Sequence, residues 1–507
     1  FCETFFIFTF LLKVVKSIKI IYNKEYREGE QIMKTFLRKI KNIFFGNSIA
    51  QRLFQGYLIA MLIGALLLVL PFSCAEGAEK VNFIDALFIS ASACSDTGLT
   101  TLQLSSQFSF FGQLVIILLV QIGGIGILTL KIMFLLFLGK KIKLKERLFG
   151  ASERGSGKLG GSVDLIKTSL AVLFITEFVA AILMMIRFLT VPEYREMFPS
   201  TGKLIWTAIF HSISATNNAG FDIFPGGTSL VVFKGDYFIQ IVTMLCLIIG
   251  GIGFPIFYDI DDYFKAKRKK EFYQVSLFTK FSLKSYFIVG FGGFILVVIS
   301  ELLAPTSSGL LYSQDFTVME KIFALIFQTT SARNDGFATV DLNILQPSTN
   351  LLLTISMCIG ASPSSTGGGL RCTTFLLVVY LIKSVATGTD RVEIYNRSVP
   401  KNTVNKALGV FIATLFVVVG SSLLLLMVNS DNSIFTIEAV LLEVGSAFGT
   451  TGLSLGITYH LNVLSKIILI FVMFIGYVGI STSLLVWSDK KVVKNLRELP
   501  EEDITIG

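Results

Sequence analysis

Long apolar stretches alternate with short basic clusters along this chain. Each apolar interval is interrupted near its middle by a less hydrophobic stretch poor in Lys and Arg, such as Ser73–Glu79 or Asn429–Ser433. Basic loops of membrane proteins stay in the cytoplasm, so each interval must leave the cytoplasm and return. A spanning helix needs about 20 residues, which predicts two spans per interval, eight in all, with both termini cytoplasmic. The basic clusters are Lys34–Arg52, Lys140–Lys158, Lys265–Lys284, Lys383–Lys406 and Lys490–Arg497.

A further segment remains in each interval once two spans are assigned, and the four segments resemble one another. Each ends in Gly followed by Leu or Phe, with a hydroxyl residue six positions before the glycine. The glycines are separated by 122, 116 and 116 positions, and self-similarity at a fixed period indicates a repeat architecture. The segments are Asn82–Leu99, Leu204–Phe221, Glu320–Phe337 and Thr436–Leu453.

These segments predict the fold class. Each is an apolar run of about 11–13 residues before a polar, glycine-containing end, which is too short to span and suits a re-entrant half-helix. Irregular backbone at membrane depth is tolerated only where it is buried in protein or lines a water-filled path. We therefore predict an all-α integral membrane protein with four membrane–pore–membrane repeats, that is eight spans and four re-entrant pore loops around one pseudo-fourfold pore.

The repeat boundaries follow the basic clusters. Residues 47–139, 140–264, 265–388 and 389–489 form repeats one to four, between a cytoplasmic N-terminal segment, 1–46, and a cytoplasmic tail, 490–507. Residue one is Phe, and the first methionine is Met33, which opens a basic stretch. We expect residues 1–32 to be an upstream extension.

Composition supports the membrane assignment and limits the chemistry. Of 507 residues, 53% are apolar and 16% charged, and the mean hydropathy is +0.71, whereas soluble chains carry roughly 25% charge. The net charge of +9 is the excess of cytoplasmic loops rather than a nucleic-acid surface. Six cysteines without paired spacing and two histidines offer no disulfide framework, metal cofactor or catalytic constellation. The chain is expected to be a non-enzymatic protein of a bacterial-type plasma (inner) membrane.

The four glycine segments are the predicted functional site. Each half-helix would aim its partly negative C-terminal end at the pore axis. Carbonyls of the residues before each glycine would then form a ring of oxygen ligands for a dehydrated monovalent cation, because glycine permits the close approach and backbone angles such a ring needs. The predicted filter residues are Asp96, Thr97, Gly98, Asn218, Ala219, Gly220, Asn334, Asp335, Gly336, Thr450, Thr451 and Gly452.

A second site is predicted from composition alone. Ten positions that interrupt the second helix of repeat three contain four glycines, one proline and four hydroxyl residues, which cannot hold a regular lipid-facing helix. A mobile loop beneath the filter explains them, and a simple kink between packed helices is the alternative. The loop consists of Gly360, Ala361, Ser362, Pro363, Ser364, Ser365, Thr366, Gly367, Gly368 and Gly369.

At these residues the sequence resembles the Trk/Ktr/HKT superfamily of potassium transporters, most closely the Ktr-type membrane subunit. The likeness covers nearly all of residues 47–507. Besides the four filter segments it includes Gln121–Ile127 (QIGGIGI), Ile249–Ile256 (IGGIGFPI), Met357–Leu370 (MCIGASPSSTGGGL) and Leu499–Gly507 (LPEEDITIG).

The resemblance implies a homodimeric potassium transporter with an intramembrane gating loop, contacting membrane lipid and no nucleic acid. A cytosolic nucleotide-binding regulatory subunit of the KtrA/TrkA type would control it. Potassium is the implied substrate, sodium a candidate activator, and the nucleotide belongs to the regulatory partner, so the chain itself carries no cofactor. Sodium-selective relatives often replace the first filter glycine with serine, so Gly98 favours potassium.

The sequence also departs from the family. Relatives carry an arginine opposite the gating loop where this chain has Tyr477, whose phenol could donate one hydrogen bond to a loop carbonyl. Asp96 and Asp335 stand where small neutral residues are commoner. Behind the filter they would need partners, with Arg333 as a candidate for one of them, and at the pore mouth they would concentrate cations. Arg371 matches a basic residue of the family and is expected to anchor the loop or face the vestibule.

Alternatives remain for several residues and for the function. His211 fits a packed imidazole better than a ligand, Glu443 is expected to bind backbone amides behind the filter, and Lys131 and Glu177 lie either near a span end or at a dimer seam. A sodium-permeable or sodium-coupled transporter of the same family is the rival within the class. A membrane scaffold without transport is the rival of another class.

Overall fold

The computed structural model describes residues 49–138, 162–227, 229–305, 309–389, 391–480 and 482–483. The chain divides into two units, residues 1–54 with 482–507, and residues 55–481. Nearly all the described residues belong to the second unit, to which the account below applies. The expectations for residues 1–32 and for the tail 490–507 lie outside the described residues.

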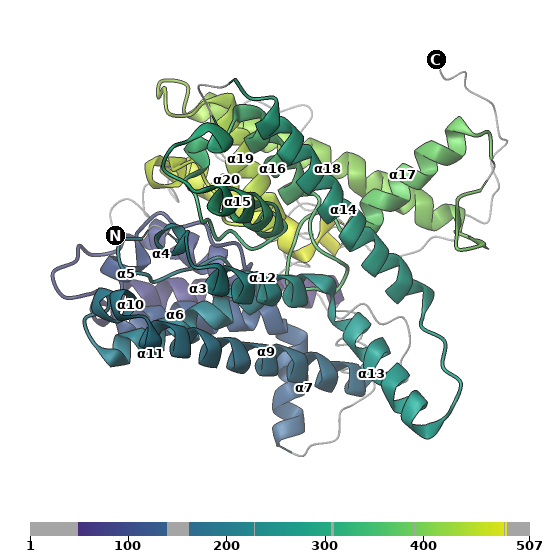
Figure 1. The fold of residues 1–507 in the computed structure, drawn as a ribbon, viewed down its shortest axis with the longest axis horizontal. Helices are drawn as coiled ribbons and strands as arrows, with labels where there is room; N and C mark the ends of the chain where they lie inside the picture. The colour runs from purple at the N-terminus through teal and green to yellow at the C-terminus, as the bar shows by residue number, and fades with distance from the viewer. Residues whose placement is uncertain are drawn as a thin grey trace, which may run out of the picture. The chain divides into compact units, whose positions relative to one another are not determined.

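The described chain is helical (Figure 1). Four helices are long and apolar enough to cross a membrane: α3 (Ile49–Val69), α9 (Ser162–Thr190), α14 (Leu277–Leu302) and α18 (Lys401–Val428). Large apolar side chains are exposed along these helices, for example Phe178 at 68% and Phe416 at 76%. An exposed apolar surface of this kind suits contact with hydrocarbon rather than water.

Four shorter helices coincide with the repeated segments of the sequence. They are α4 (Phe83–Cys94), α11 (Thr201–Thr216), α15 (Val318–Ser331) and α19 (Ile437–Gly449). Hydroxyl side chains start three of them, because Ser200, Thr317 and Thr436 each accept a hydrogen bond from the backbone three residues on and so satisfy a free N–H of the first turn. These helices have 12 to 16 residues, too few to span.

A third group of helices follows the short ones: α6 (Phe110–Ile125), α12 (Tyr237–Ile252), α16 (Pro347–Cys358) and α20 (Val463–Val478). Sequence analysis predicted an interruption only at 360–369. The structure also bends the chain at Gly126 (φ +83°) before α7 (Ile127–Phe137), and at Gly253 (φ +101°) before α13 (Phe254–Lys269). These bends are 96° and 89°, and α20 likewise ends at a left-handed Gly479.

The bends affect how spans are counted. By length and composition, the described residues contain four spanning helices, or six if each bent pair is one span. An all-α membrane protein is therefore well supported, whereas the eight spans and four repeats stay predictions.

The remaining elements are α5 (Leu104–Gln107), α10 (Pro192–Met197), α17 (Cys372–Ala386), a hairpin of β1 (Glu393–Ile394) and β2 (Arg397–Ser398), and five short 3-10 turns at Pro71–Ser73, Val231–Phe233, Leu310–Tyr312, Leu342–Ile344 and Ile457–His460.

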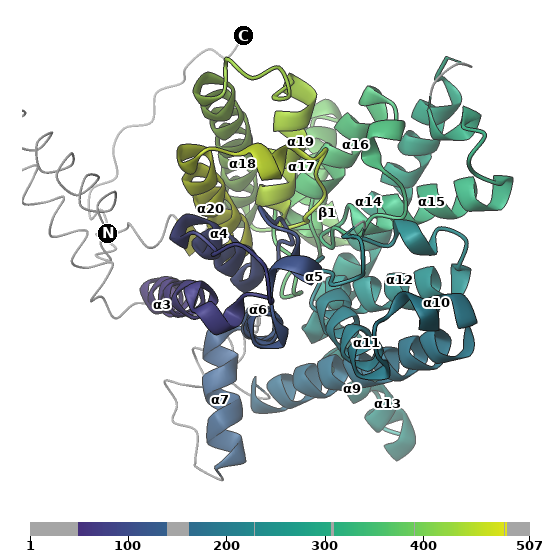
Figure 2. The same ribbon diagram turned by 90° about the vertical axis from the view of Figure 1, so that its left-hand side faces the viewer.

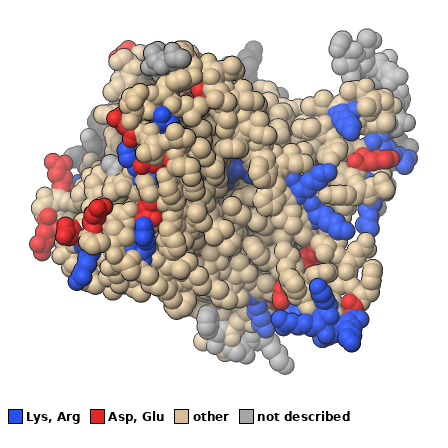
Figure 3. All heavy atoms as spheres, in the orientation of Figure 1, with Lys and Arg blue, Asp and Glu red and all other residues tan. Residues whose placement is uncertain are grey.

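The short helices are enclosed by the longer ones. In Figures 1 and 2, α11 lies alongside α9 and α12, and α19 lies among α16, α18 and α20. Aromatic side chains fill much of the space around α11, where Phe188 packs against Phe198, Phe224 and Phe233. Figure 3 shows few charges across the middle of the visible face and more at its two ends. The abundant phenylalanines therefore serve both core packing and the exposed apolar surface.

Candidate functional site

The four glycines predicted as the filter meet at one place. At each of them an added Cβ would collide with backbone of the next segment, so the segments are in direct contact. The contacts close a ring: Gly98 lies against Ala219 and Gly220, Gly220 against Asp335, Gly336 against Thr451 and Gly452, and Gly452 against Thr97 and Gly98. The carbonyl oxygens of Ala219, Asp335, Thr451 and Thr97 are the atoms that approach the neighbouring glycines.

Each segment has the same backbone conformation. The glycines have φ of +87°, +67°, +85° and +102°, and the residues two positions earlier, Asp96, Asn218, Asn334 and Thr450, are also left-handed. The residue between them is not. Left-handed backbone is costly for residues other than glycine, so four such residues at equivalent positions indicate a conformation that the surrounding protein enforces.

Hydrogen bonds tie each segment to the end of its short helix. The N–H of the residue before glycine donates to the carbonyl of Ser92, Ser214 and Ser446, at 2.9, 2.8 and 2.8 Å. The third segment differs, because Asp335 N donates to Ser331 at 2.9 Å. The hydroxyl six residues before glycine has a visible role in the fourth segment, where Ser446 Oγ accepts from Gly452 N at 2.9 Å.

Burial differs within each segment in a regular way. The two residues before each glycine are buried, whereas all four glycines are partly exposed. Within the ring, the glycines are therefore the residues that reach open space. Side chains of the buried residues point into the protein, away from that space.

Three of the left-handed residues use their side chains to bind the 360–369 loop or its neighbours. Asn218 Oδ1 accepts from Thr366 Oγ1 at 3.1 Å, and Thr450 Oγ1 accepts from Gly368 N at 2.8 Å. Asn334 Nδ2 donates to Gly368 O at 3.2 Å and to Gly449 O. Asp96 lies against Gly123 of α6, and neither of its carboxylate oxygens has a hydrogen-bond partner among the described residues.

The 360–369 loop contacts three of the residues that precede the ring glycines, and it bonds to two further helices. Ser362 N donates to Gly251 O at 3.0 Å, and Thr366 N to Gly250 O at 3.3 Å, both at the end of α12. Gly369 N donates to Gly476 O of α20 at 3.0 Å. All ten residues are buried or only partly exposed, so the loop fills the space between these helices.

Two arginines hold the ends of the loop. Arg371 donates to Gly367 O and to Ser365 Oγ, the latter at 3.4 Å. Arg333 donates to Gly360 O at 3.3 Å and to Tyr286 O, with its guanidinium 4.1 Å from the centre of the Tyr286 ring. The expected pairing of Arg333 with an aspartate is thus wrong, because its guanidinium turns away from both carboxylates toward the loop.

Tyr477 also differs from its expected contact. Its hydroxyl donates to Gly123 O of α6 at 2.5 Å and lies 2.8 Å from the Tyr57 hydroxyl. The two rings meet edge to face, with centroids 5.0 Å apart. The acceptor is therefore a carbonyl of α6 and not a carbonyl of the loop, and Gly123 carries contacts from both Tyr477 and Asp96.

Other buried polar residues have structural partners. Glu443 accepts from the hydroxyls of Ser454 and Thr458, at 2.6 and 2.5 Å, rather than from the backbone amides that were expected. His211 bonds to Thr243 Oγ1 at 2.9 Å and packs on Phe337. Glu177 accepts from Gln121 and Asn217, whereas Lys131 is exposed on α7.

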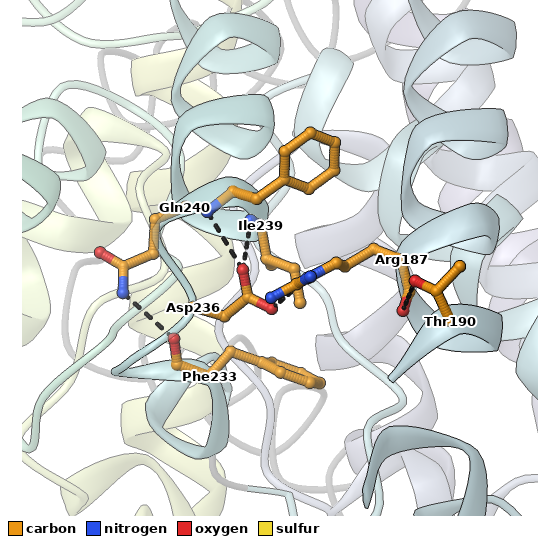
Figure 4. A network of polar contacts seen from close by, with 7 residues as sticks. Arg187, Thr190, Phe233, Asp236, Ile239 and Gln240 are labelled. Atoms are coloured by element: carbon orange, nitrogen blue, oxygen red, sulfur yellow. Dashed lines mark hydrogen bonds and ion pairs between the residues drawn. The ribbon is translucent and has the colours of Figure 1, made fainter. Parts of the chain in front are cut away.

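Figure 4 shows a polar network at the start of α12, apart from the glycine ring. Asp236 caps the helix by accepting from Phe238 N and Ile239 N, and its other oxygen pairs with Arg187 at 2.7 Å. Gln240 donates to Phe233 O at 3.1 Å. These contacts fix the entry of α12, although Gln240 Oε1 is buried without a hydrogen-bond partner among the described residues.

The sequence analysis did not predict that the ends of α12 and α20 form hydrogen bonds with the loop. The carbonyls of Gly250, Gly251 and Gly476 accept its hydrogen bonds, and no expectation assigned them a role. The signal was present in the motifs QIGGIGI and IGGIGFPI, whose last glycines are the bends at Gly126 and Gly253. Adjacent glycines inside an apolar helix mark a close backbone approach.

Comparison with known proteins agrees with this geometry. A family model described as a cation transport protein, TrkH, matches residues 59–494. The chain is 36% identical over 459 residues to the Ktr system potassium uptake protein D of Bacillus subtilis, covering 90% of this chain and 97% of that protein. It is 32% identical over 460 residues to the potassium/sodium uptake protein NtpJ of Enterococcus hirae, covering 90% and 97%.

A solved structure shares the fold. The potassium transporter TrkH from Vibrio parahaemolyticus superposes with a TM-score of 0.62 at 20% identity, covering 88% of this chain and 86% of that one. The Ktr system potassium uptake protein B of Bacillus subtilis is 33% identical, over 89% of this chain and 95% of its own length. The chain therefore belongs to the TrkH family of cation transport proteins, and it is a multi-pass membrane ion transporter, not an enzyme.

Proposed function

We propose that this protein takes up potassium ions across the plasma (inner) membrane through a filter built by one chain. The observation that carries the proposal is the closed ring of four glycines with the carbonyls of Thr97, Ala219, Asp335 and Thr451. Rings of backbone carbonyls replace the hydration shell of a dehydrated cation. Relatives named as potassium uptake proteins support potassium as the ion.

The pore is formed by four membrane–pore–membrane repeats around a pseudo-fourfold axis, with eight spans. Two residues and the glycine of each segment make the filter, and the left-handed residue two before each glycine turns its side chain outward as a support. The short helices end beside the ring, so their partly negative C-terminal ends favour a cation there.

The 360–369 loop is the gate. It lies beneath the ring and is held closed by hydrogen bonds to α12, to α20 and to three filter supports. Arg371 and Arg333 fix its two ends. Opening requires that these bonds break together, and each is worth about 0.5–1.5 kcal/mol net. A gate held by many weak bonds can be shifted by a modest binding free energy elsewhere.

The gate responds to a cytosolic partner. The chain acts as a homodimer with a nucleotide-binding regulatory subunit of the KtrA/TrkA type, which carries the nucleotide. Several relatives are named as parts of a Ktr system, which supports an assembly of more than one kind of subunit. Both termini of the chain are cytoplasmic in this arrangement.

Sodium permeation or coupling is the second candidate. Asp96 and Asp335 are fully buried beside the ring, and the oxygens of both carboxylates have no hydrogen-bond partner among the described residues. A buried charge needs a partner or a cation, and a more negative filter wall would bind sodium more strongly. The name of the Enterococcus hirae relative includes both ions. A membrane scaffold has no use for the ring and is not favoured.

The deciding experiment measures cation flux through purified protein in liposomes, with potassium and sodium gradients compared. Gly452→Ala introduces a methyl group at φ +102° against Thr97 O and Gly98 Cα, so potassium flux should fall by at least an order of magnitude. Gly420→Ala, in open space on α18, is the matched control and should keep its flux. Equal flux of the two ions would favour the sodium candidate, and no flux by the parent protein would favour the scaffold.

A further inference from the structure

Helix α13 presents a basic and aromatic surface that transport does not explain. Its last turn and the next residue carry four successive cationic side chains, Lys267, Arg268, Lys269 and Lys270, all exposed. Lys265 pairs with Asp261 at 2.5 Å, whereas the following four form no ion pair with any described residue. Figure 3 shows Lys and Arg gathered at this corner of the molecule, where α13 ends in Figure 1.

Two large aromatic side chains stand exposed within this surface. Phe264 is 53% exposed, and Phe272, just after the helix, is 94% exposed. Phe272 belongs to a loop that is fixed in place, because Glu271 N donates to Ala266 O at 2.9 Å and Ser276 N donates to Asp259 Oδ2 at 2.9 Å. Phe264 and the ordered Phe272 therefore add exposed apolar surface to the basic end of α13.

The anchor of this loop is Asp259, a buried carboxylate of α13. It accepts from the Tyr273 hydroxyl as well as from Ser276 N. Burial and the adjacent carboxylate raise the pKa of Tyr273, so the phenol stays a hydrogen-bond donor at neutral pH. The loop is therefore closed on the helix whatever binds to Phe272.

The bend at Gly253 sets the direction of α13. Helix α12 is apolar, and α13 leaves it at 89°. Helix α12 has 16 residues and qualifies as a span only together with α13, so we infer that the charged last turn of α13 lies at the membrane surface. A surface helix with exposed aromatic and cationic side chains is the form that binds at the headgroup boundary, and basic clusters beside a span attract anionic lipid.

We propose that the basic end of α13, with Phe264 and Phe272, binds anionic lipid headgroups at the cytoplasmic membrane surface. The ammonium and guanidinium groups contact lipid phosphates, and the two rings enter the interface between headgroups and acyl chains. The assignment rests on α12 as a span with basic loops on the cytoplasmic side, and it does not depend on which ion is transported.

Acidic residues near this surface limit where lipid binds. Asp261 and Asp262 lie one turn nearer the bend and are engaged by Lys265, while Asp164 of α9 and Glu271 complete the charged groups close to it. Asp164, Asp261 and Asp262 repel lipid phosphate nearer the bend, whereas Glu271 lies within the proposed surface and is outnumbered there by the four cationic residues.

The test places a tryptophan at the surface of the full-length protein. Phe272→Trp is reconstituted into liposomes that contain brominated phosphatidylglycerol or brominated phosphatidylcholine, and quenching is measured as the difference from the parent protein. We expect quenching by both lipids, at least about twofold stronger with phosphatidylglycerol, and loss of this preference near 1 M salt, where charges are screened within about 3 Å.

Matched variants separate charge from position. Adding Lys267→Gln, Arg268→Gln and Lys269→Gln should remove the preference for phosphatidylglycerol, whereas Lys383→Gln, Lys401→Gln and Lys406→Gln should leave it unchanged. Tyr395→Trp, 48% exposed in the β1–β2 turn, should not be quenched. Absence of quenching of the tryptophan at position 272 would overturn the proposal. A change in its emission that occurs only after a regulatory subunit is added would also overturn it. Ion flux, measured on the same liposomes, reports separately on the proposed function.

Discussion

At the scale of single residues, three of the four left-handed residues that precede the ring glycines connect the ring to the 360–369 loop. Asn218, Asn334 and Thr450 each bond to the 360–369 loop, although they come from segments far apart in sequence. These three side chains therefore link the backbone beside the ring to the position of the loop. Asp96 occupies the fourth place and contacts α6 instead.

Asn334 gives the sharpest prediction at this scale. Its amide donates to Gly368 O of the loop and to Gly449 O at the end of α19, so Asn334→Ala leaves two buried carbonyls without this donor. We expect a loss of about 1–3 kcal/mol in unfolding free energy and a higher potassium leak through purified protein in liposomes without a regulatory subunit.

Asn343→Ala is the matched control, because Asn343 is exposed and its side chain bonds only within its own turn, to Asp341. It should change neither thermal unfolding nor leak. An Asn334→Ala protein with parental leak and stability would show that the loop does not depend on this contact.

Sequence reasoning located the four glycine segments that meet in the ring but not what the neighbouring side chains do. The spacing of Gly98, Gly220, Gly336 and Gly452 was enough to locate the site, because a repeated glycine marks a repeated backbone conformation. Asparagine tolerates left-handed backbone, so Asn218 and Asn334 were recognisable as special. Aspartate tolerates it as well, whereas the β-branched Thr450 carries the same conformation because its surroundings impose it, which no single position reveals.

At the scale of elements, the breaks in the second helices matter more than the helices themselves. Sequence composition identified the break at 360–369, where glycine, proline and hydroxyl residues are concentrated. It did not identify the bends at Gly126 and Gly253, because the flanking residues are apolar and read as one continuous span. The bend at Gly253 brings the start of α13 to the loop, where Phe254 N donates to Ser364 O at 3.2 Å.

Substitution of Arg371 tests what holds the loop closed. Arg371→Gln removes the charged donor to Gly367 O and Ser365 Oγ, and charge-assisted hydrogen bonds are worth about 1.5–3 kcal/mol. The closed loop should be destabilised, and basal potassium flux in liposomes should rise on the order of tenfold, since 1.4 kcal/mol is a factor of ten.

Arg397→Gln, exposed on β2, removes the same charge at a distance from the loop and should leave flux at the parental level. A fall in flux for Arg371→Gln, with intact folding, would mean that the arginine keeps the pathway open rather than closed.

At the scale of the whole molecule, the ring is an assembly of four distant parts of one chain. No local pattern could place residue 98 beside residue 452; only the repeat made that contact predictable, because equivalent segments can close around one axis. The contacts between neighbouring segments, and the order in which they follow one another around the ring, needed the structure.

A bound ion should therefore stabilise the whole fold. A ligand that binds only the native state raises stability by about 2.7 kcal/mol at 100 times its dissociation constant. In detergent, potassium chloride should raise the unfolding temperature relative to choline chloride at equal ionic strength, and Gly452→Ala should abolish the difference.

The Gly420→Ala protein should keep the full potassium effect. Stabilisation by sodium equal to that by potassium would favour the sodium-permeable candidate. Equal unfolding temperatures in all three salts for the parent protein would argue against a cation held within the ring.

The bond between Phe254 and Ser364 has a mechanical consequence. Helix α13 has 16 residues, or about 24 Å at 1.5 Å per residue, and it begins at the Gly253 bend next to the loop. A lateral force on its far end would act through this lever arm on Ser364. Bilayer thickness, curvature or tension could then alter ion flow without any soluble signal reaching the protein.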